Sequence, residues 1–479
     1  MKAPVEFNPL GELPAGWSWQ PLQNLTASPK QDVVDGPFGS DLKASEYVAA
    51  GVPIARLQNI DRNAFVTKNI KYLTPEKAAD LSRHEFRPND ILITKLGDPL
   101  GKACIVPASI GRGVIVADLV RVRPDESRVD RQYLTFAINS PSIIKQFELH
   151  TKGTTRPRVN LSVLRQLPIP VAPREVQGEI VAELEKQFSR LDEAVANLQR
   201  VKANLKRYKA SVLKAAVEGR LVETEATLAR REGRTYETGE QLLQRVLEER
   251  RAKWAGRGKY KEPVAADGAS LGVLPDGWAT ASLDMISTDS GYGTSQKCGY
   301  ENGGPAVLRI PNVQHGVLDL LDLKFAPTEF KLGQSDAVSS GDMLIIRTNG
   351  SKSLIGRAAV VMAAPQLKMS FASYLIRFRL ASADCIPAWV SVVWQTSQMR
   401  QWIEAHAATS AGQHNVSMTV LAKAAIPVPP VTEQARIVAE VDRHLSIIRE
   451  VEAEVDANLQ RARALRQATL AKAFSSKLV

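Results

Sequence analysis

The sequence predicts an α+β fold in which two pseudo-symmetric, mainly β domains are joined by two long antiparallel coiled-coil helices. Three observations support this prediction. Several motifs occur twice along the 479 residues, each copy is rich in short apolar runs bounded by turn residues, and each copy ends in a long stretch with an apolar stripe of period seven. Because the repeat is about 255 residues long, each copy is the size of a domain rather than of a solenoid unit.

The duplication involves motifs near both ends of each copy. Three motifs recur in the same order: LPAGW at 13–17 returns as LPDGW at 274–278, IPV at 169–171 returns at 426–428, and QGEIVAE at 177–183 returns as QARIVAE at 434–440. Repeated order over this length predicts two similar domains, each offering a similar site to a partner.

Each predicted domain consists of short strands with one helical region. In the first copy, apolar runs at 91–94, 103–106, 114–116 and 119–122 are separated by turn residues, as is typical of strands. Residues 133–147 have helical spacing, interrupted at 139–141 by Asn-Ser-Pro. The second copy repeats this order, with strands expected at 343–346, 358–362 and 374–378 and a helix at 387–403.

After its proline-rich step, each copy continues as a long amphipathic helix. The first stripe consists of Leu184, Leu191, Leu198, Leu205 and Val212, and the matching positions of the second copy are Val441, Ile448, Val455, Ala462 and Thr469. A helix of about 40 residues is about 60 Å long, so it cannot bury such a stripe on its own domain. A homodimeric coiled coil is one explanation. Two helices of equal length and phase can also pair with each other, so we expect an intramolecular antiparallel pair.

These patterns predict five segments. They are a first mainly β domain over residues 1–170, a long helix within 171–222, a charged connector with a short helix over 223–270, a second mainly β domain over 271–427, and a second long helix within 428–479.

The composition favours a polyanionic partner. Lys and Arg number 62 against 51 Asp and Glu, which gives a formal net charge of +11. The sequence has no apolar run near 18 residues and no signal-peptide pattern at Met1, so we expect a cytoplasmic protein without a membrane partner. The three cysteines lack metal-ligand spacing, which agrees with a reducing compartment.

Motifs for catalysis are missing from the sequence. The segment Gly97–Ala103 is too short between its glycines for a phosphate-binding loop and lacks the hydroxyl that would hold magnesium. The chain has no Gly-x-Ser-x-Gly elbow, no His-Glu-x-x-His pair and no Asn/Asp-Pro-Pro-aromatic tetrapeptide of an adenine methyltransferase. Asp125 and Glu126 lie in a loop that nothing marks as a metal site. We therefore predict a non-catalytic chain with no metal site.

Polar loops in each copy carry side chains suited to DNA. Arg and Lys can bond to guanine, Asn and Gln can read adenine, and Ser and Thr can hold phosphates. The candidate DNA-binding residues of the first copy are Ser40, Lys43, Arg56, Lys95, Lys102, Thr154, Thr155, Arg156, Arg158 and Asn160. Those of the second copy are Tyr292, Ser295, Gln296, Lys297, Arg309, Arg347, Asn349, Ser351, Lys352, Ser410, Gln413, His414 and Asn415. Such loops are also ordinary turns, and Arg56 and Arg309 are equally compatible with a structural role.

Taken together, the duplicated motifs resemble the specificity subunit of Type I restriction-modification systems. The matching pieces are LPxGW at 13–17 and 274–278, IPVPP at 426–430 followed by Glu433-Gln434 and Ile437-Val438, and LAKAF at 470–474. The resemblance covers essentially the whole chain. The first copy departs from the pattern, because it lacks the adjacent prolines and the Glu-Gln pair.

The resemblance implies that each mainly β domain is a target recognition domain that reads one half of a bipartite, asymmetric site in double-stranded DNA. The helices would fix the spacer between the halves and dock two modification (methyltransferase) subunits. The chain would bind no cofactor itself. S-adenosylmethionine would belong to the methyltransferase subunits, and ATP and magnesium to restriction (motor and nuclease) subunits, whose presence stays open.

Two other classes of function remain alternatives. One is a coiled-coil scaffold or interaction protein with no role on DNA. The other is a self-contained methyltransferase or nuclease, which the missing catalytic motifs argue against.

Overall fold

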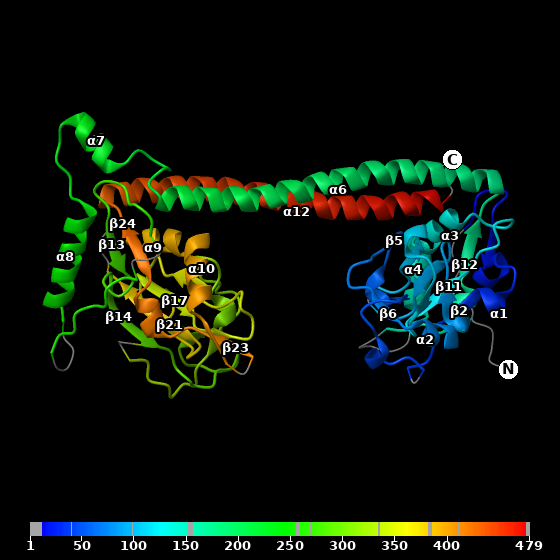
Figure 1. Ribbon diagram of the computed structural model, residues 1–479, viewed down its shortest axis with the longest axis horizontal. Coiled ribbons are helices and arrows are strands. Elements are labelled where there is room, and N and C mark those ends of the chain that lie inside the picture. Colours follow the sequence, from blue (N-terminus) through cyan, green and yellow to red (C-terminus); the bar gives the residue numbers. More distant parts are fainter. Residues whose placement is uncertain are drawn as a thin grey trace. The chain divides into compact units, whose positions relative to one another are not determined.

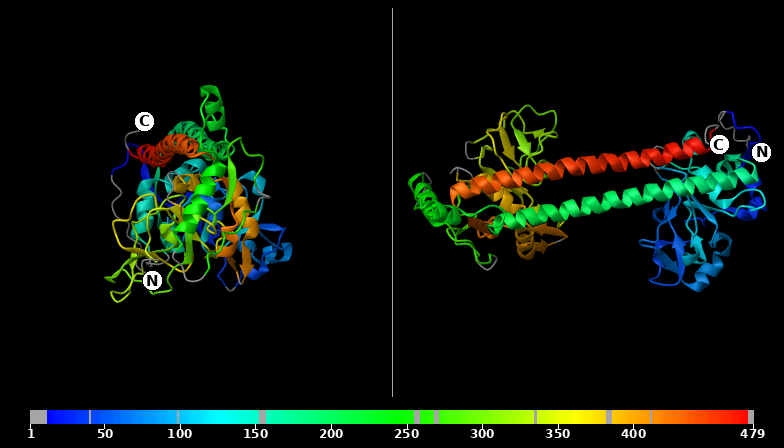
Figure 2. Two further views of the ribbon diagram at one scale, coloured as in Figure 1. Left: turned by 90° about the vertical axis from the view of Figure 1, so that its left-hand side faces the viewer. Right: turned by 90° about the horizontal axis from the view of Figure 1, so that it is seen from above.

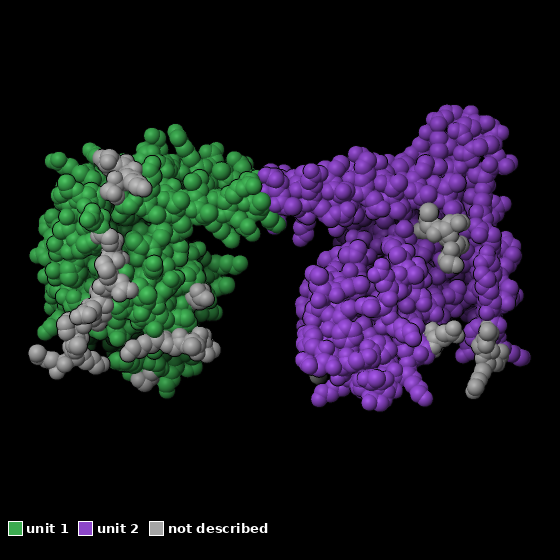
Figure 3. All heavy atoms as spheres, turned by 180° about the vertical axis from the view of Figure 1, so that it is seen from behind, with its two compact units in different colours: residues 1–200, 455–479 green, residues 201–454 purple. Residues whose placement is uncertain are grey.

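The chain forms two compact units. The computed structural model describes residues 12–39, 41–97, 99–151, 157–254, 259–267, 271–333, 336–381, 386–410 and 412–475, without the side chain of Ser410. Unit 1 consists of residues 1–200 and 455–479, and unit 2 of residues 201–454 (Figure 3). Figure 1 shows the strands of each unit on one side of its share of the two long helices.

Unit 1 consists of short strands and short helices that precede the first long helix. Its strands are β1 (Ser18–Pro21), β2 (Val33–Asp35), β3 (Val52–Ala55), β4 (Ile60–Asp61), β5 (Ala64–Phe65), β6 (Lys71–Leu73), β7 (Glu85–Phe86), β8 (Ile91–Thr94), β9 (Ala103–Ile105), β10 (Gly113–Ile115), β11 (Leu119–Val122) and β12 (Pro168–Val171). Its short helices are α1 (Pro29–Asp32), α2 (Pro75–Asp80), α3 (Arg131–Ile138), α4 (Pro141–Leu149) and α5 (Leu161–Gln166). The long helices are α6 (Arg174–Val217) and α12 (Val431–Ala473).

Unit 2 begins with two helices of the connector and repeats the mainly β arrangement. Its strands are β13 (Ala279–Ser282), β14 (Ser287–Tyr292), β15 (Ala306–Leu308), β16 (Lys324–Phe325), β17 (Asp342–Ile346), β18 (Thr348–Asn349), β19 (Ala358–Val360), β20 (Met369–Phe371), β21 (Leu375–Leu380), β22 (Ala408–Ser410), β23 (Gln413–Asn415) and β24 (Ala425–Val428). Its helices are α7 (Glu225–Glu232), α8 (Gly239–Ala252), α9 (Ile386–Trp394), α10 (Ser397–His406) and α11 (Met418–Ala422).

The duplication extends to sheet topology and register. A four-stranded sheet has the order β2-β11-β8-β9 in unit 1 and β14-β21-β17-β19 in unit 2. In the first sheet Arg121 faces Leu92, and in the second Arg377 faces Leu344. The central strands β8, β11 and β17 are buried along their whole length, which explains their continuous apolar runs. The α+β fold class is confirmed.

A buried ion pair that the sequence analysis did not anticipate also occurs twice. In unit 1, Arg123 Nε lies 2.9 Å from Asp90 Oδ1, and in unit 2, Arg379 Nε lies 2.8 Å from Asp342 Oδ1. Hydrogen bonds to Asp342 raise the pKa of Arg379. A buried carboxylate is costly without a partner, so each pair fixes the register of its sheet at the turn before the central strand.

The long helices pair with each other within each unit. In unit 1, Leu184 and Phe188 of α6 share a core with Leu470 and Phe474 from the end of α12. In unit 2, residues 212–217 of α6 share a core with Val441, Leu445 and Ile448 from the first half of α12. The start of one helix therefore meets the end of the other, and Figure 2 shows the two running side by side. The predicted intramolecular antiparallel pair is confirmed.

The repeated motifs form the junction between each domain and its long helix. The LPxGW segment makes a tight turn in which Trp17 N donates to Pro14 O at 3.1 Å, and Gly16 has φ +82°. The turn leads into β1, which pairs with the IPV strand β12. Gly277, with φ +81°, gives the same turn before β13, which pairs with β24. Both copies have glycine at this position of the turn, because an L side chain is strained at this φ.

An aromatic side chain packs against each junction, from α3 in unit 1 and from α9 in unit 2. In unit 1, Tyr133 Oη donates to Pro170 O at 2.8 Å, and its ring lies edge-on to Trp17 with centroids 6.3 Å apart. In unit 2, Trp389 Nε1 donates to Pro427 O at 2.6 Å, and its ring lies edge-on to Trp278 at 5.7 Å. Both rings are buried, so the same carbonyl is satisfied by two different aromatic donors.

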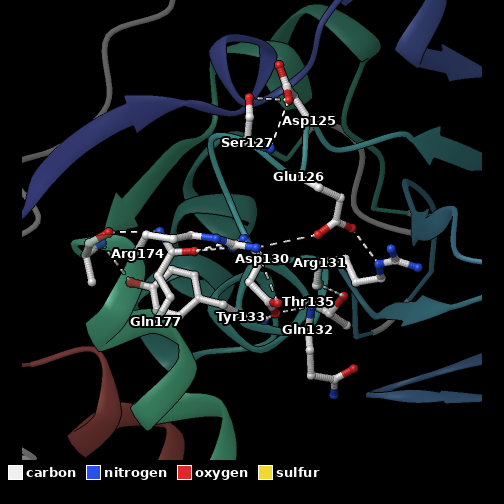
Figure 4. A network of polar contacts seen from close by, with 11 residues as sticks. Asp125, Glu126, Ser127, Asp130, Arg131, Gln132, Tyr133, Thr135, Arg174 and Gln177 are labelled. Carbon is white, nitrogen blue, oxygen red and sulfur yellow. Dashed lines mark hydrogen bonds and ion pairs between the residues drawn. The ribbon is translucent and has the colours of Figure 1, made fainter.

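The glutamine of the QxxIVAE motif ties the long helix to the domain (Figure 4). Gln177 Nε2 donates to Ala172 O at 2.8 Å, while its Oε1 accepts from Asp130 N at 2.8 Å. Asp130 in turn caps α3 through Gln132 N and Tyr133 N. In unit 2, Gln434 Nε2 donates to Pro429 O at 2.8 Å. The glutamine is thus a structural residue in both copies.

Glu433, which has no counterpart in the first copy, binds the start of the connector helix α7. Its carboxylate accepts from Trp278 Nε1 at 3.0 Å and from Glu225 N at 2.8 Å, at the start of α7. Glu225 pairs with Arg436 and Arg234, each at 2.6 Å. Burial raises the pKa of Glu433, because the charged form is desolvated there. Glu433 therefore anchors the connector, which belongs to unit 2.

One helix prediction was wrong in its extent. The segment predicted as a single helix over 387–403 is two helices, α9 and α10. The first ends at Trp394, and Thr396 caps the second, because its hydroxyl accepts from Met399 N at 3.2 Å. Among the described residues, no helix is both long and apolar enough to cross a membrane.

Candidate nucleic-acid interface

In unit 2, two of the predicted loops meet in one small sheet. Its strand order is β18-β23-β22, and Thr348 pairs with Asn415 while Asn349 pairs with His414. Thr348 Oγ1 donates to Gln413 Oε1 at 3.2 Å. Gln413 and Asn415 are exposed. The sheet therefore presents amide side chains from segments that lie about 65 residues apart in the sequence.

An aromatic-cation pair lies beside this sheet. The Arg347 guanidinium lies over the Tyr292 ring, 4.8 Å from its centroid, and Tyr292 is 47% exposed. The Arg347 backbone is held at both ends, because its N donates to Tyr374 O and its O accepts from Val416 N, each at 2.9 Å. This arrangement offers a stacking surface and a fixed cation next to amide groups, which suits contact with bases.

The loop that follows Arg347 is held by its own side chains and by α10. Asn349 Oδ1 accepts from Ser351 N at 2.8 Å, and the Ser351 hydroxyl bonds to Ser353. Lys352 is exposed and lies 3.8 Å from Glu404. Arg400 donates to the carbonyls of Lys352 and Ile355. The backbone of this predicted loop is therefore ordered while its tip stays exposed.

The other predicted residues of unit 2 differ in their availability. Ser295, Gln296 and Lys297 are exposed and follow Thr294, whose N donates to Phe371 O. His414 Nδ1 bonds to the Thr409 hydroxyl at 3.0 Å. Arg309 Nη2 instead bonds to the carbonyl and carboxylate of Asp322, both at 3.0 Å, which holds a turn of its own domain.

Unit 1 has a matching arrangement of the backbone at the equivalent register. Leu96 forms a bridge with Arg158, as Thr348 does with Asn415 in unit 2. Val159 N donates to Lys95 O at 3.0 Å, as Val416 N does to Arg347 O. Arg158 is exposed, and its Nη2 lies 3.4 Å from Asp118. Arg158 and Asn415 therefore occupy matching positions, and they are separated by the same 257 residues as the two IPV strands.

Several predicted residues of unit 1 are engaged within the domain. Lys95 Nζ lies 2.9 Å from Asp35, and Lys102 Nζ lies 3.2 Å from Asp61. Asn160 caps α5, because its Oδ1 accepts from Val163 N at 2.9 Å. Arg56 Nη2 donates to Asn69 O, which repeats the local arrangement of Arg309. Lys43 is exposed.

Four predicted residues, Ser40, Thr154, Thr155 and Arg156, lie outside the described residues, as does the side chain of Ser410. The sequence analysis missed two residues that the fold brings to the interface of unit 2. Tyr374 is 47% exposed and its backbone holds Arg347, and Thr348 bonds to Gln413. Tyr374 begins an apolar strand, so no local signal marked it, whereas Thr348 stands between Arg347 and Asn349 in a loop that was selected without it.

The acidic residues considered for a metal site serve other purposes. Asp125 accepts from Ser127 N and Oγ, and Glu126 pairs with Arg131 at 2.5 Å (Figure 4). Within the described ranges, no group of three or more His, Cys, Asp or Glu side chains could hold a metal ion.

Comparisons with known proteins identify relatives over nearly the whole chain. No protein-family model matches the sequence. The chain is 23% identical over 474 residues to the Type I restriction enzyme EcoKI specificity subunit of Escherichia coli strain K12, which covers 98% of this chain and 90% of that protein. The StySPI specificity subunit of Salmonella potsdam matches with the same identity and coverage.

A solved structure shares the fold. It comes from work described as the structural basis underlying complex assembly and conformational transition of the type I R-M system. The match has a TM-score of 0.61 at 18% identity and covers 98% of this chain and 100% of that one. The chain is thus related along nearly its whole length to Type I restriction enzyme specificity subunits, and its fold of two mainly β units and paired long helices matches that solved structure.

Proposed function

We propose that each mainly β domain reads one half of a bipartite, asymmetric DNA target. In this proposal residues 1–170 and 271–427 are the two target recognition domains, and the segments within 171–222 and 428–479 are the spacer helices. The connector over 223–270 belongs to neither reading surface.

The observation that carries the proposal is the pair of matching interface positions with different chemistry. Arg158 and Asn415 share a register, and so do Lys95 and Arg347. An arginine favours guanine and an asparagine favours adenine. Equivalent frames with different side chains are expected of two readers of unlike half-sites, so the target should not be a palindrome.

Among the candidate residues, we assign base reading in unit 2 to Arg347, Asn349, Gln413 and Asn415, with Tyr292 as a stacking surface. Ser295, Gln296, Lys297, Ser351 and Lys352 are proposed to contact backbone phosphates, because they are exposed and carry donors. Arg56 and Arg309 are proposed to be structural, because each holds a carbonyl thirteen residues further along the chain.

The paired helices are proposed to set the spacer and to dock two methyltransferase subunits. Support comes from their length of 44 and 43 residues and from their mutual apolar seam. Those subunits would supply S-adenosylmethionine-dependent methylation, and restriction subunits, where present, would use ATP and magnesium. A scaffold without a role on DNA would not need an exposed polar sheet in unit 2 and an exposed arginine at the matching position of unit 1 on a basic chain.

Methylome sequencing of the host with and without this chain tests the proposal. The expected result is loss of one bipartite methylated motif whose two halves differ in sequence. An unchanged methylome in a host with active methyltransferase subunits would refute it. Duplex binding by the purified assembly should also weaken steeply with rising salt, which a protein scaffold would not show.

A further inference from the structure

Unit 2 contains a cavity in which all the charged lining residues are basic. Its volume is about 270 Å³, and it lies between α6, the start of α10 and β19. Lys206 and Lys209 come from α6, His315 precedes Gly316, Arg357 precedes β19, and Arg400 belongs to α10. None of the described residues that line the cavity is an Asp or a Glu.

Arg357 is the central feature of this cavity. Its Nε atom is buried and has no hydrogen-bond partner among the described residues. Arg400, by contrast, is engaged by Glu404 at 2.6 Å. Leaving a buried donor without a partner costs free energy, so an acceptor from outside the chain would be bound favourably there.

The first copy shows what such a cation normally has as a partner. Lys102 follows Gly101 as Arg357 follows Gly356, and Gly101 and Gly356 share positive φ values of +71° and +74°. Lys102 lies 3.2 Å from Asp61. Asn63 N donates to Ala103 O in unit 1, and Gly316 N donates to Ala358 O in unit 2, so Asn63 and Gly316 are equivalent. Two residues before them, Asp61 is therefore the equivalent of Gln314. The second copy therefore has a neutral amide where the first has the counter-ion.

The basic groups of the cavity also repel one another. Burial lowers the pKa of His315, and Arg357, Lys209 and Arg400 lower it further by their charge. Burial likewise lowers the pKa of Arg357, and the charge of Arg400 lowers it further. A bound anion would remove this repulsion.

We propose that this cavity binds a phosphate group. Arginine and lysine together are the side chains that hold phosphate oxygens most often. The cavity adjoins the loop that follows Arg347, since Arg400 bonds to the carbonyls of Lys352 and Ile355. Resting on the proposed function, the phosphate belongs to the DNA backbone next to the half-site that unit 2 reads. A free phosphate compound is the other possible source of the same chemistry.

Thermal unfolding of the purified assembly with inorganic phosphate tests the cavity itself. At matched ionic strength, phosphate should raise the Tm of the wild type relative to chloride. Arg357→Gln and Lys209→Gln should each abolish that rise, and in chloride each should unfold no earlier than the wild type, because repulsion is relieved. Lys214→Gln is the control, since Lys214 is an exposed residue of α6 outside the cavity, paired only weakly with Glu218 at 3.9 Å. Equal phosphate responses in all four proteins, or no response in the wild type, would overturn the proposal.

Salt-dependent duplex binding then identifies the source of the phosphate. Loss of one phosphate contact should reduce the slope of log K against log salt by about 0.9 and weaken binding at least about tenfold in Arg357→Gln, with Lys214→Gln unchanged. An unchanged slope, with the phosphate response intact in the wild type, assigns the cavity to a free phosphate compound and overturns the DNA assignment. A wild type that responds to phosphate but binds no DNA refutes the proposed function and leaves the cavity site standing.

Discussion

The Asn415→Ala variant gives the sharpest test of the two-reader proposal. Asn415 lies on β23, where its backbone pairs with both Thr348 and Ala408, and its side chain is exposed. Removing the amide leaves both backbone pairings in place. The variant should therefore fold normally and lose only what the amide contacts outside the chain.

The expected magnitude follows from the geometry of an amide on adenine. A good bidentate contact between a side chain and a base contributes about 1–3 kcal/mol of discrimination, which is about 5- to 150-fold in affinity. The loss should be confined to one base pair of one half-site. Substitutions at other base pairs of the target should keep their wild-type effect, because well-separated positions are roughly additive.

The assay is competition binding on duplexes in which each base pair of the target is changed in turn. Arg158→Ala is the matched variant, because Arg158 holds the equivalent register in unit 1. The two variants should lose discrimination at base pairs in opposite half-sites. If Asn415→Ala weakens binding to all duplexes alike, Asn415 contacts a phosphate or supports the fold, and the assignment of base reading to this sheet is wrong.

Three further outcomes follow from the frame of the molecule. Deleting seven residues from both α6 and α12 removes about 10 Å of rod, so the preferred spacer should shorten by about 3 base pairs, and an unchanged methylated motif would exclude the ruler. Tyr133→Phe removes a buried hydroxyl that bonds to Pro170 and Ala172, so we expect a loss of about 1–3 kcal/mol in urea unfolding, against little change for the exposed control Tyr208→Phe. Because the folded-state pKa of Glu433 is raised above 4.5, the folded state holds the proton more tightly, and stability should fall as pH rises from 4.5 through the raised value. Denaturant midpoints between pH 4 and 7 should show that this fall is smaller in Glu433→Gln, and an identical pH profile would contradict the raised pKa.

Much of the fold could be predicted because its strongest signals are local. The strands β8 and β11 occupy the predicted runs 91–94 and 119–122, since strands buried on both faces read as continuous apolar runs. The long helices were predicted from a stripe that repeats every seven residues, and the stripe residues Leu184, Val441 and Ile448 are buried. Such patterns depend only on residues close in sequence, so they can be recognised without the tertiary structure.

The features that could not be predicted depend on long-range contacts. The break at Thr396 is an exception, because its cap is a local contact that lies inside an otherwise helical pattern. The pair Arg123–Asp90 joins residues 33 positions apart, and no sequence pattern predicted this pair or its counterpart Arg379–Asp342. Sequence analysis selected the loops that meet in the small sheet of unit 2. It could not find their pairing, because a two-residue strand such as β18 carries no period.

The division between repeated and unrepeated residues explains how such a chain can change its target. Three motifs that recur between the copies serve the junction of a domain with the helices: the LPxGW turn, the IPV strand and the glutamine of the QxxIVAE segment. The interface positions at matching register have diverged, with Arg158 in one copy and Asn415 in the other. Since neither side chain contributes to the junction, either can be replaced without disturbing the frame that positions it. Under the proposed function, selection for a new half-site would act on a few exposed side chains, while the junctions and the helices would keep the spacing between the two halves.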